Sequence, residues 1–212
     1  MKDLIILTAD KNFEYLLKGL LPKVNKTENT IAFTFDIRIH QYRDAGVLNG
    51  AHDFLRPFCG MYKYALIIFD KDGCGRDTAS SEQVEIEVEN KLSINGWEDR
   101  AKAIVVDPEI ENWMWVKPTH IQYAISWNFE IDIYDWLHNE GLKDHNQSKP
   151  IRPKEALEAA LKRNRTPRSS SIYLDLATKA SYLRCIDPAF IKMTGLLKQW
   201  FAQPNPQLFN QQ

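Results

Sequence analysis

The amino-acid sequence predicts an α/β protein whose mostly parallel sheet has helices on both faces. Two observations lead to this prediction. Leu4–Thr8 and Tyr64–Phe69 are short, continuous apolar runs, which is typical of strands that are buried on both faces of a sheet. Segments with apolar residues at helical spacing separate such runs, so that strands and helices alternate along the chain.

The first half of the chain contains four predicted strands and the helices between them. The helix after the first strand is expected to end at Pro22, because proline interrupts helical hydrogen bonding. Ser80, with Gln83 three residues later, predicts the capped start of another helix. Gly96 is expected just past the end of that helix. The four strands are expected at Leu4–Thr8, Ile31–Ile39, Tyr64–Phe69 and Ala101–Val106.

From Trp113 onward the pattern changes to helices. The sequence therefore predicts three parts: a core over residues 1–118, a helical C-terminal extension packed on that core over residues 119–203, and a polar tail over residues 204–212. Asp187-Pro188 predicts the capped start of the last helix, which is expected to run to about Phe201. The other helices of the extension are expected at Ile131–Asn139, Pro153–Asn164 and Ile172–Ser181.

Composition argues against several classes of protein. No apolar run approaches the roughly 18 residues that span a bilayer, and the apolar run at the N-terminus is too short for a signal peptide. The three cysteines lie far apart, without a Cys-x-x-Cys pair, which argues against a structural zinc site or a disulfide framework. Cys74 is expected to be exposed in a glycine-rich loop. We expect a cytoplasmic protein without membrane contacts.

The charge is unevenly distributed, although the net charge is only -1. Between Lys149 and Trp200 there are eleven Lys or Arg residues and four Asp or Glu residues, so the rest of the chain is acidic. The acidic part could hold cations, and the basic part could contact phosphate or an acidic partner. Alternatively, the two parts dock on each other electrostatically.

Acidic side chains follow three of the predicted strands at the points where the strands end. Asp10 follows the first strand, Asp70 and Asp72 follow the third, and Glu109 and Glu111 follow the fourth. The carboxyl ends of parallel strands form the edge of the sheet where ligands bind. Carboxylate oxygens suit Mg²⁺ or Mn²⁺, and such ions assist phosphoryl and phosphodiester chemistry. The plainer alternative is that Asp and Gly are simply common turn residues.

Different roles are expected for these carboxylates. Asp70, Asp72 and Glu111 are the expected metal ligands, and Asp10 and Glu109 are the expected catalytic groups. If a helix begins at position 108, positions 109 and 111 project in different directions, so only one of the two glutamates faces the site. Glu109 is the preferred one. Either glutamate could instead be a first-turn residue that the helix dipole favours.

A basic stretch over residues 162–171 suits contacts with phosphate. Arginine side chains and serine hydroxyls bind phosphate oxygens, and a helix that begins near Ser170 would add backbone donors. The same composition fits an acidic protein partner or a solvated helix end. The expected nucleic-acid- or phosphate-binding residues are Lys149, Arg152, Lys154, Arg163, Arg165 and Arg168.

His40 is a further candidate at the end of the second predicted strand. Asp44 follows four residues later and His52 lies beyond the next glycines, and such residues suit zinc binding or acid/base chemistry. The plainer interpretation is a surface or hydrogen-bonded histidine.

Four segments resemble a bacterial TOPRIM-like family that is found in anti-phage defence islands. The family is similar to components of the methylation-associated defence system, and the resemblance covers nearly the whole chain. The segments are TADKNFEYLLKGLLPK, LIIFDKDGCG, NGWEDRAKAIVVDPEIENWMW and KPIRPKEALEAALKRNRTPRSSSIYLDLA.

The resemblance implies a TOPRIM-like sheet, a Mg-dependent nuclease, and other subunits of a defence system as partners, together with DNA or RNA. Catalytic TOPRIM sites have a glutamate directly after the first strand, where this chain has Thr8 and Ala9. Asp10 would then act from a shifted position. The alternative is a non-catalytic regulatory or protein-interaction subunit that keeps the fold. An unrelated metal-dependent phosphatase is a third interpretation of the Asp70–Asp72 loop.

Overall fold

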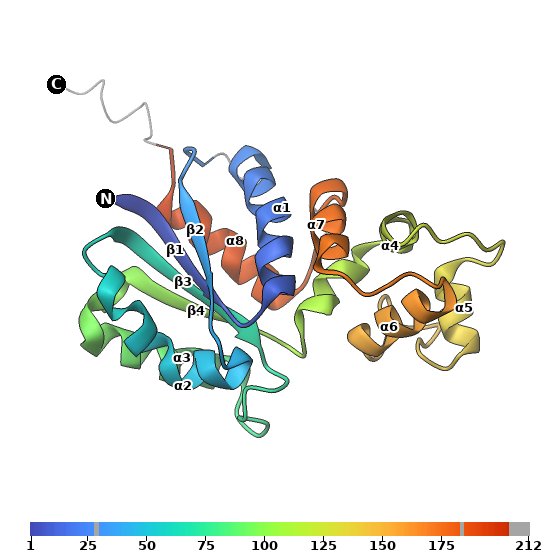
Figure 1. Cartoon of the computed structure of the whole chain (residues 1–212), viewed down its shortest axis with the longest axis horizontal. Coiled ribbons are helices and arrows are strands. Elements are labelled where there is room, and N and C mark those ends of the chain that lie inside the picture. The colour runs from blue at the N-terminus through green and yellow to red at the C-terminus, as the bar shows by residue number, and fades with distance from the viewer. Residues whose placement is uncertain (28–29, 183–184, 204–212) are drawn as a thin grey trace.

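The computed structural model describes residues 1–27, 30–182 and 185–203, and within them the fold is α/β. Four strands form one sheet in the order β2-β1-β3-β4, and every neighbouring pair is parallel (Figure 1). The prediction of an α/β protein with a parallel sheet is therefore confirmed. The strands are β1 (Lys2–Thr8), β2 (Phe35–Ile39), β3 (Tyr62–Asp70) and β4 (Ala101–Val106).

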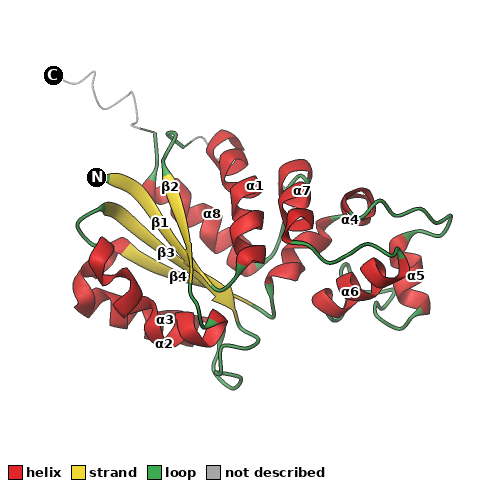
Figure 2. Cartoon of the chain, in the orientation of Figure 1, coloured by secondary structure: helices red, strands yellow, loops and turns green. Residues whose placement is uncertain are grey.

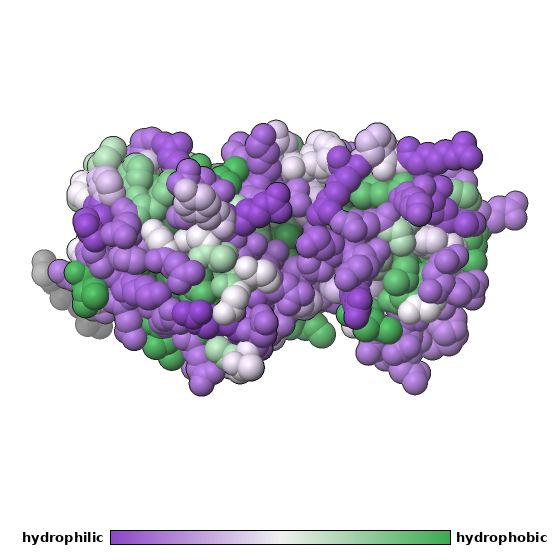
Figure 3. All heavy atoms as spheres, turned by 60° about the horizontal axis from the view of Figure 1, so that its bottom comes forward, coloured by the Kyte–Doolittle hydropathy of each residue, from purple (hydrophilic) through white to green (hydrophobic). Residues whose placement is uncertain are grey.

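Helices lie on both faces of the sheet (Figure 1). One face is covered by α2 (Arg43–Leu55) and α3 (Ser81–Leu92), and the other by α1 (Lys11–Thr27) and α8 (Pro188–Trp200). The face that carries α2 and α3 is mainly hydrophilic on its outer side (Figure 3).

The helical extension has two parts. One part projects beyond the sheet, and the other returns to it (Figure 2). After β4, a 3-10 segment (Ile110–Val116) leads into the projecting helices. The projecting helices are α4 (Pro118–Ala124), α5 (Ile133–Asn139) and α6 (Pro153–Arg163), whereas α7 (Ser170–Lys179) packs on α1 and α8 packs on the sheet.

Among the described residues, every helix is too short or too polar to cross a membrane. The predicted tail over residues 204–212 lies outside the described residues.

The apolar runs form the interior of the sheet, because helices exclude water from both faces. Leu4–Leu7 in β1 and Ala65–Phe69 in β3 are fully buried. The second strand begins at Phe35 rather than at Ile31, because the backbone N–H of Ile31 donates to the carbonyl oxygen of Phe201, outside the sheet. That part of the predicted strand is therefore wrong.

The prediction that Pro22 ends the first helix is also wrong, since α1 continues to Thr27. Pro22 lies on the exposed side of α1, whereas Leu21 and Val24 are buried in the core. Burial of these apolar side chains outweighs the hydrogen bond that proline cannot donate.

The prediction that Cys74 is exposed is wrong as well, since its side chain is buried. The loop after β3 folds back, and the backbone N–H of Cys74 donates to the carbonyl oxygen of Lys71.

The predicted caps of α3 and α8 are present. Ser80 and Gln83 form the expected capping box at the start of α3. Asp187 caps α8 by accepting from the backbone N–H of Phe190 at 3.1 Å. The same buried carboxylate also accepts from the indole N–H of Trp113 at 2.9 Å, so this cap joins α8 to the segment after β4.

Gly19 lets α7 approach α1 closely. A Cβ atom at this position would lie 2.8 Å from the Cβ atom of Ala177 and 2.9 Å from the carbonyl oxygen of Leu174. At the end of α1 nearest the strand ends, the Ser170 hydroxyl donates to Asn12 Oδ1 at 2.9 Å. These contacts hold the start of α7 beside the start of α1.

We expect Gly19→Ala to lower the free energy of unfolding by about 1–3 kcal/mol, because the added methyl group would collide with α7. Gly195→Ala in α8 is the matched control. Its added methyl group meets open space, so it should raise the free energy of unfolding by about 0.5–1 kcal/mol. Urea denaturation measures both values, and equal stabilisation by the two substitutions would contradict the close approach of α7 to α1.

Candidate functional site

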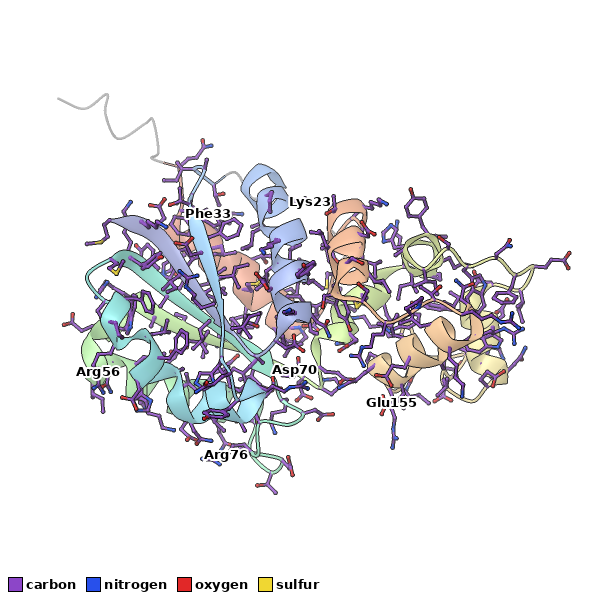
Figure 4. All side chains as sticks on the ribbon, viewed as in Figure 1. Lys23, Phe33, Arg56, Asp70, Arg76 and Glu155 are labelled. Carbon is purple, nitrogen blue, oxygen red and sulfur yellow. The ribbon has the colours of Figure 1, made fainter. Side chains whose placement is uncertain are left out.

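A cavity of about 520 Å³ lies where the strands end, at the junction of the sheet with the helical extension. The strand register explains its position, because Thr8 lies beside Ile39 and Ile68, and Asp70 lies beside Val106. Figure 4 shows Asp70 at this junction, with Glu155 of α6 across from it. The charged residues that line the cavity are the carboxylates Asp10, Asp70 and Glu111 and the cations Lys11, Arg43, Lys154 and Arg168.

Asp70, the last residue of β3, is at the centre of the acidic side of the cavity. Its Oδ1 atom accepts from the backbone N–H of Ile110 at 2.7 Å. Its own backbone N–H donates to Asp44 Oδ1 at 2.9 Å. Burial raises the pKa of Asp70 well above its ordinary value, and the neighbouring charges of Asp44, Glu111 and Asp10 raise it further. A carboxyl group with such a raised pKa in a cavity is a candidate functional group.

Asp44, which the sequence suggested only as a neighbour of His40, is a further member of this acidic cluster. It lies in the first turn of α2, just beyond β2, and burial raises its pKa. The charge of Asp10 adds to that increase. The signal that could have identified it is the same one that identified Asp70: a carboxylate that closely follows a parallel strand.

The two glutamates after β4 are both buried but have different surroundings. Glu111 lines the cavity, whereas Glu109 lies beside it. Glu109 accepts from the backbone N–H and from the Nζ atom of Lys154, each at 3.2 Å, and so caps the start of α6. Glu111 accepts from the hydroxyl of Tyr173 and lies 3.5 Å from Arg168 Nη2. The structure thus brings Glu111 to the cavity and pairs the preferred Glu109 with α6.

Asp10 lines the cavity and also caps α1. Its Oδ1 atom accepts from the backbone N–H groups of Asn12 at 2.8 Å and Phe13 at 3.1 Å. Thr8, two residues earlier, is fully buried, and its hydroxyl oxygen has no hydrogen-bond partner among the described residues. The aspartate at the end of β1, from which we expected acid/base chemistry, therefore also serves as the cap of α1.

Asp72, which the sequence predicts as a metal ligand beside Asp70, does not lie at the cavity with Asp70. Its side chain is exposed and does not line the cavity, because its backbone N–H donates to the carbonyl oxygen of Pro108 and the loop turns the residue outward. Among the described residues, no group of three or more His, Cys, Asp or Glu side chains is arranged to hold one metal ion. Asp10, Asp70 and Glu111 nevertheless fit a hard cation chemically, since they offer carboxylate oxygens whose mutual repulsion a cation would relieve.

Two of the predicted basic residues face these carboxylates. Lys154 of α6 lines the cavity; burial lowers its pKa, but the charges of Glu109, Glu111 and Asp70 outweigh burial and leave the pKa raised. Arg168 lines the cavity beside Glu111 and also pairs with Glu158. Both cations come from the helical extension.

The remaining predicted basic residues do not line the cavity. Lys149 donates from Nζ to the carbonyl oxygen of Asn112 at 2.8 Å. Arg163 lies over the aromatic rings of Phe129 and Trp136, and Arg165 is exposed. Arg152 is also exposed and lies 3.8 Å from Glu155.

His40 is buried and lines the cavity at the end of β2. Its Nδ1 atom accepts from the backbone N–H of Tyr42 at 3.2 Å, which places the proton of the neutral ring on Nε2. Burial lowers the pKa of His40, which favours this neutral form. Gly46 and Gly50 of α2 leave room for the ring, because a Cβ atom at Gly46 would collide with it.

Comparisons of the chain with protein-family models, with curated proteins and with solved structures find no match.

In metal-free buffer, we expect Asp70→Asn to raise the free energy of unfolding at neutral pH and to flatten its pH dependence. The folded state raises the pKa of Asp70 above the ordinary 3.8, so this group stabilises the fold at low pH. That contribution is lost as the pH rises through the pKa of the folded state. Asparagine keeps an acceptor for the Ile110 N–H but removes the charge. Urea denaturation between about pH 4 and about pH 8 measures the effect.

Asp72→Asn is the matched control for this prediction. Asp72 is exposed, so its substitution should change neither the stability at neutral pH nor the pH dependence. A loss of stability at neutral pH in Asp70→Asn would show that the Asp70 carboxylate is stabilised rather than repelled by its neighbours.

Proposed function

We propose that the cavity binds a phosphodiester together with Mg²⁺ or Mn²⁺, and that the chain is a TOPRIM-like nuclease in a multi-protein bacterial defence system against phage. The observation that carries this proposal is the composition of the cavity, in which Asp10, Asp70 and Glu111 face Lys154 and Arg168. Carboxylates suit the metal ion, and the two cations suit phosphate oxygens. The position at the carboxyl edge of a parallel sheet is the usual place for such a site.

The proposed division of labour follows from these contacts. Asp70, together with Asp10 or Glu111, would hold the metal ion, which would supply charge neutralisation and activate water for attack on phosphorus. Lys154 would contact the phosphate while Glu109 holds its ammonium group in place. Arg168 would offer the phosphate those guanidinium donors that Glu111 and Glu158 do not use.

The family resemblance supports the same location. The segment IVVDPEIENWMW contains the end of β4 and Glu111, and the segment RPKEALEAALKRNRTPRSSS contains Lys154 and Arg168. Both segments therefore contribute charged side chains to one cavity. This convergence supports a shared ligand for the sheet and the helical extension.

The alternative function is a non-catalytic subunit that keeps the fold for regulation or protein contacts. Three observations favour it. Thr8 lies at the end of β1, where a catalytic glutamate is expected, and Asp10 is engaged as a helix cap. Glu109 and Glu111 already pair with cations of the same chain. In this alternative the cavity mainly fastens the helical extension to the sheet.

We expect the purified protein to cleave DNA or RNA with Mg²⁺ or Mn²⁺, and Asp70→Asn to lower the rate by about 100-fold or more, because a metal ligand is lost. Asp72→Asn should cleave at close to the wild-type rate, because Asp72 lies outside the cavity. Cleavage by Asp70→Asn at close to the wild-type rate would contradict the assignment of Asp70 as a metal ligand. If the wild-type protein cleaves no substrate and Asp70→Asn keeps full defence in cells, the non-catalytic alternative holds.

For the basic residues, we expect Lys154→Ala and Arg168→Ala to weaken nucleic-acid binding and to reduce its dependence on salt concentration, since each removes a phosphate contact. Arg152→Ala and Arg165→Ala remove the same charge outside the cavity and are the matched controls. Fluorescence anisotropy with a labelled oligonucleotide at several salt concentrations measures both effects. An equal loss in all four variants would assign binding to the general charge of the helical extension.

A further inference from the structure

The two edges of the sheet differ in whether their outward backbone groups have hydrogen-bond partners. At the β4 edge, side chains of α3 occupy two of the outward backbone N–H groups. The backbone N–H of Val105 donates to Glu85 Oε1 at 2.9 Å, and that of Ala103 donates to Glu89 Oε1 at 3.0 Å. Unpaired groups on an edge strand can pair with another chain, so these glutamates close the β4 edge to such pairing.

The β2 edge has no comparable cover. The N–H of Leu4 donates to Thr34 O and the N–H of His40 donates to Thr8 O, so the even-numbered residues of this strand turn their backbone groups toward β1. Phe35, Ile37 and Ile39 therefore turn theirs outward. No hydrogen bond among the described residues reaches these outward groups beyond the strand itself. Figure 1 shows the β2 ribbon in front of the other strands, with nothing drawn over it.

The sequence of β2, Phe-Asp-Ile-Arg-Ile, is complementary to an antiparallel copy of itself. If the pairing centres on Ile37, Ile37 lies opposite the partner's Ile37, and Phe35 lies opposite the partner's Ile39. These are the residues with outward backbone groups, so they form the hydrogen-bonded pairs of an antiparallel ladder. Asp36 then lies opposite the partner's Arg38, in the pairs where side chains come closest.

Charge selects this register over its neighbours. A shift that preserves the hydrogen-bonding pattern would place Asp36 opposite the partner's Asp36, or Arg38 opposite the partner's Arg38, and like charges in such positions are destabilising. Within one chain, Asp36 pairs with Lys2 at 2.7 Å. Arg38 is exposed and has no ion pair with any described residue.

We infer that two copies of this chain associate through their β2 edges, in antiparallel register about Ile37, to form a continuous eight-stranded sheet. The contact is isologous, because the same strand serves on both sides of a twofold axis. The edge is only five residues long, so the dimer is weak and forms in a concentration-dependent manner. The inference does not depend on the proposed function, since each cavity is built from one chain.

Analytical ultracentrifugation of the full chain from about 1 μM to about 1 mM tests the inference. The wild-type protein should pass from monomer to dimer within this range. Arg38→Glu places like charges opposite each other at two symmetric positions and should raise the dissociation constant about tenfold or more, whereas Arg38→Lys should leave it within about threefold. Lys162→Glu makes the same change of charge at an exposed position of α6 and should not alter association.

Thermal unfolding shows whether each variant is folded before its association is compared. A wild-type protein that stays monomeric over the whole range would overturn the inference. So would a dimer whose dissociation constant is the same in folded Arg38→Glu as in the wild-type protein, because the interface would then lie elsewhere. Weakening by Lys162→Glu as strong as that by Arg38→Glu would assign the effect to net charge and would also overturn it.

Discussion

Repulsion among partly buried carboxylates at the ends of the strands governs how the parts of this molecule fit together. A parallel sheet places all its strand ends on one edge, and here Asp10, Asp44, Asp70 and Glu111 meet there. Partial burial limits how far water screens these charges, so positive groups must compensate them. Lys154 and Arg168 supply part of that compensation from the helical extension. The contact between sheet and extension is therefore also the candidate site.

Most of the fold could be predicted from the sequence because its signals are local. Continuous apolar runs mark the buried strands, and Ser80 and Asp187 mark the starts of helices through their own hydrogen bonds. The sequence was misleading where a distant contact decides the structure. The helix continues through Pro22 because residues beyond it are buried in the core, and Ile31 leaves the sheet to bond with the end of α8.

The candidate site was predictable only in part, because the chain leaves strand geometry just beyond each strand. Asp70 is the last strand residue, so its direction follows from the sheet, whereas Asp72 belongs to a loop that turns outward. The place of Asp44 beside Asp70 was not predicted, because Asp44 reaches the same edge from the first turn of a helix. Composition identified a basic stretch but could not show where each side chain points. Arg168 lines the cavity, whereas Arg163 lies on aromatic rings.

The central claim is that the carboxylates around Asp70 bind a divalent cation in the cavity. A crystal structure of the full chain soaked with Mn²⁺, with anomalous diffraction to locate the ion, tests this claim most directly. We expect an anomalous peak within coordination distance of Asp70 and of at least one of Asp10 and Glu111. A cavity without a peak, or a peak held by Asp72 alone, would contradict the claim and would leave the carboxylates as a means of fastening the helical extension to the sheet.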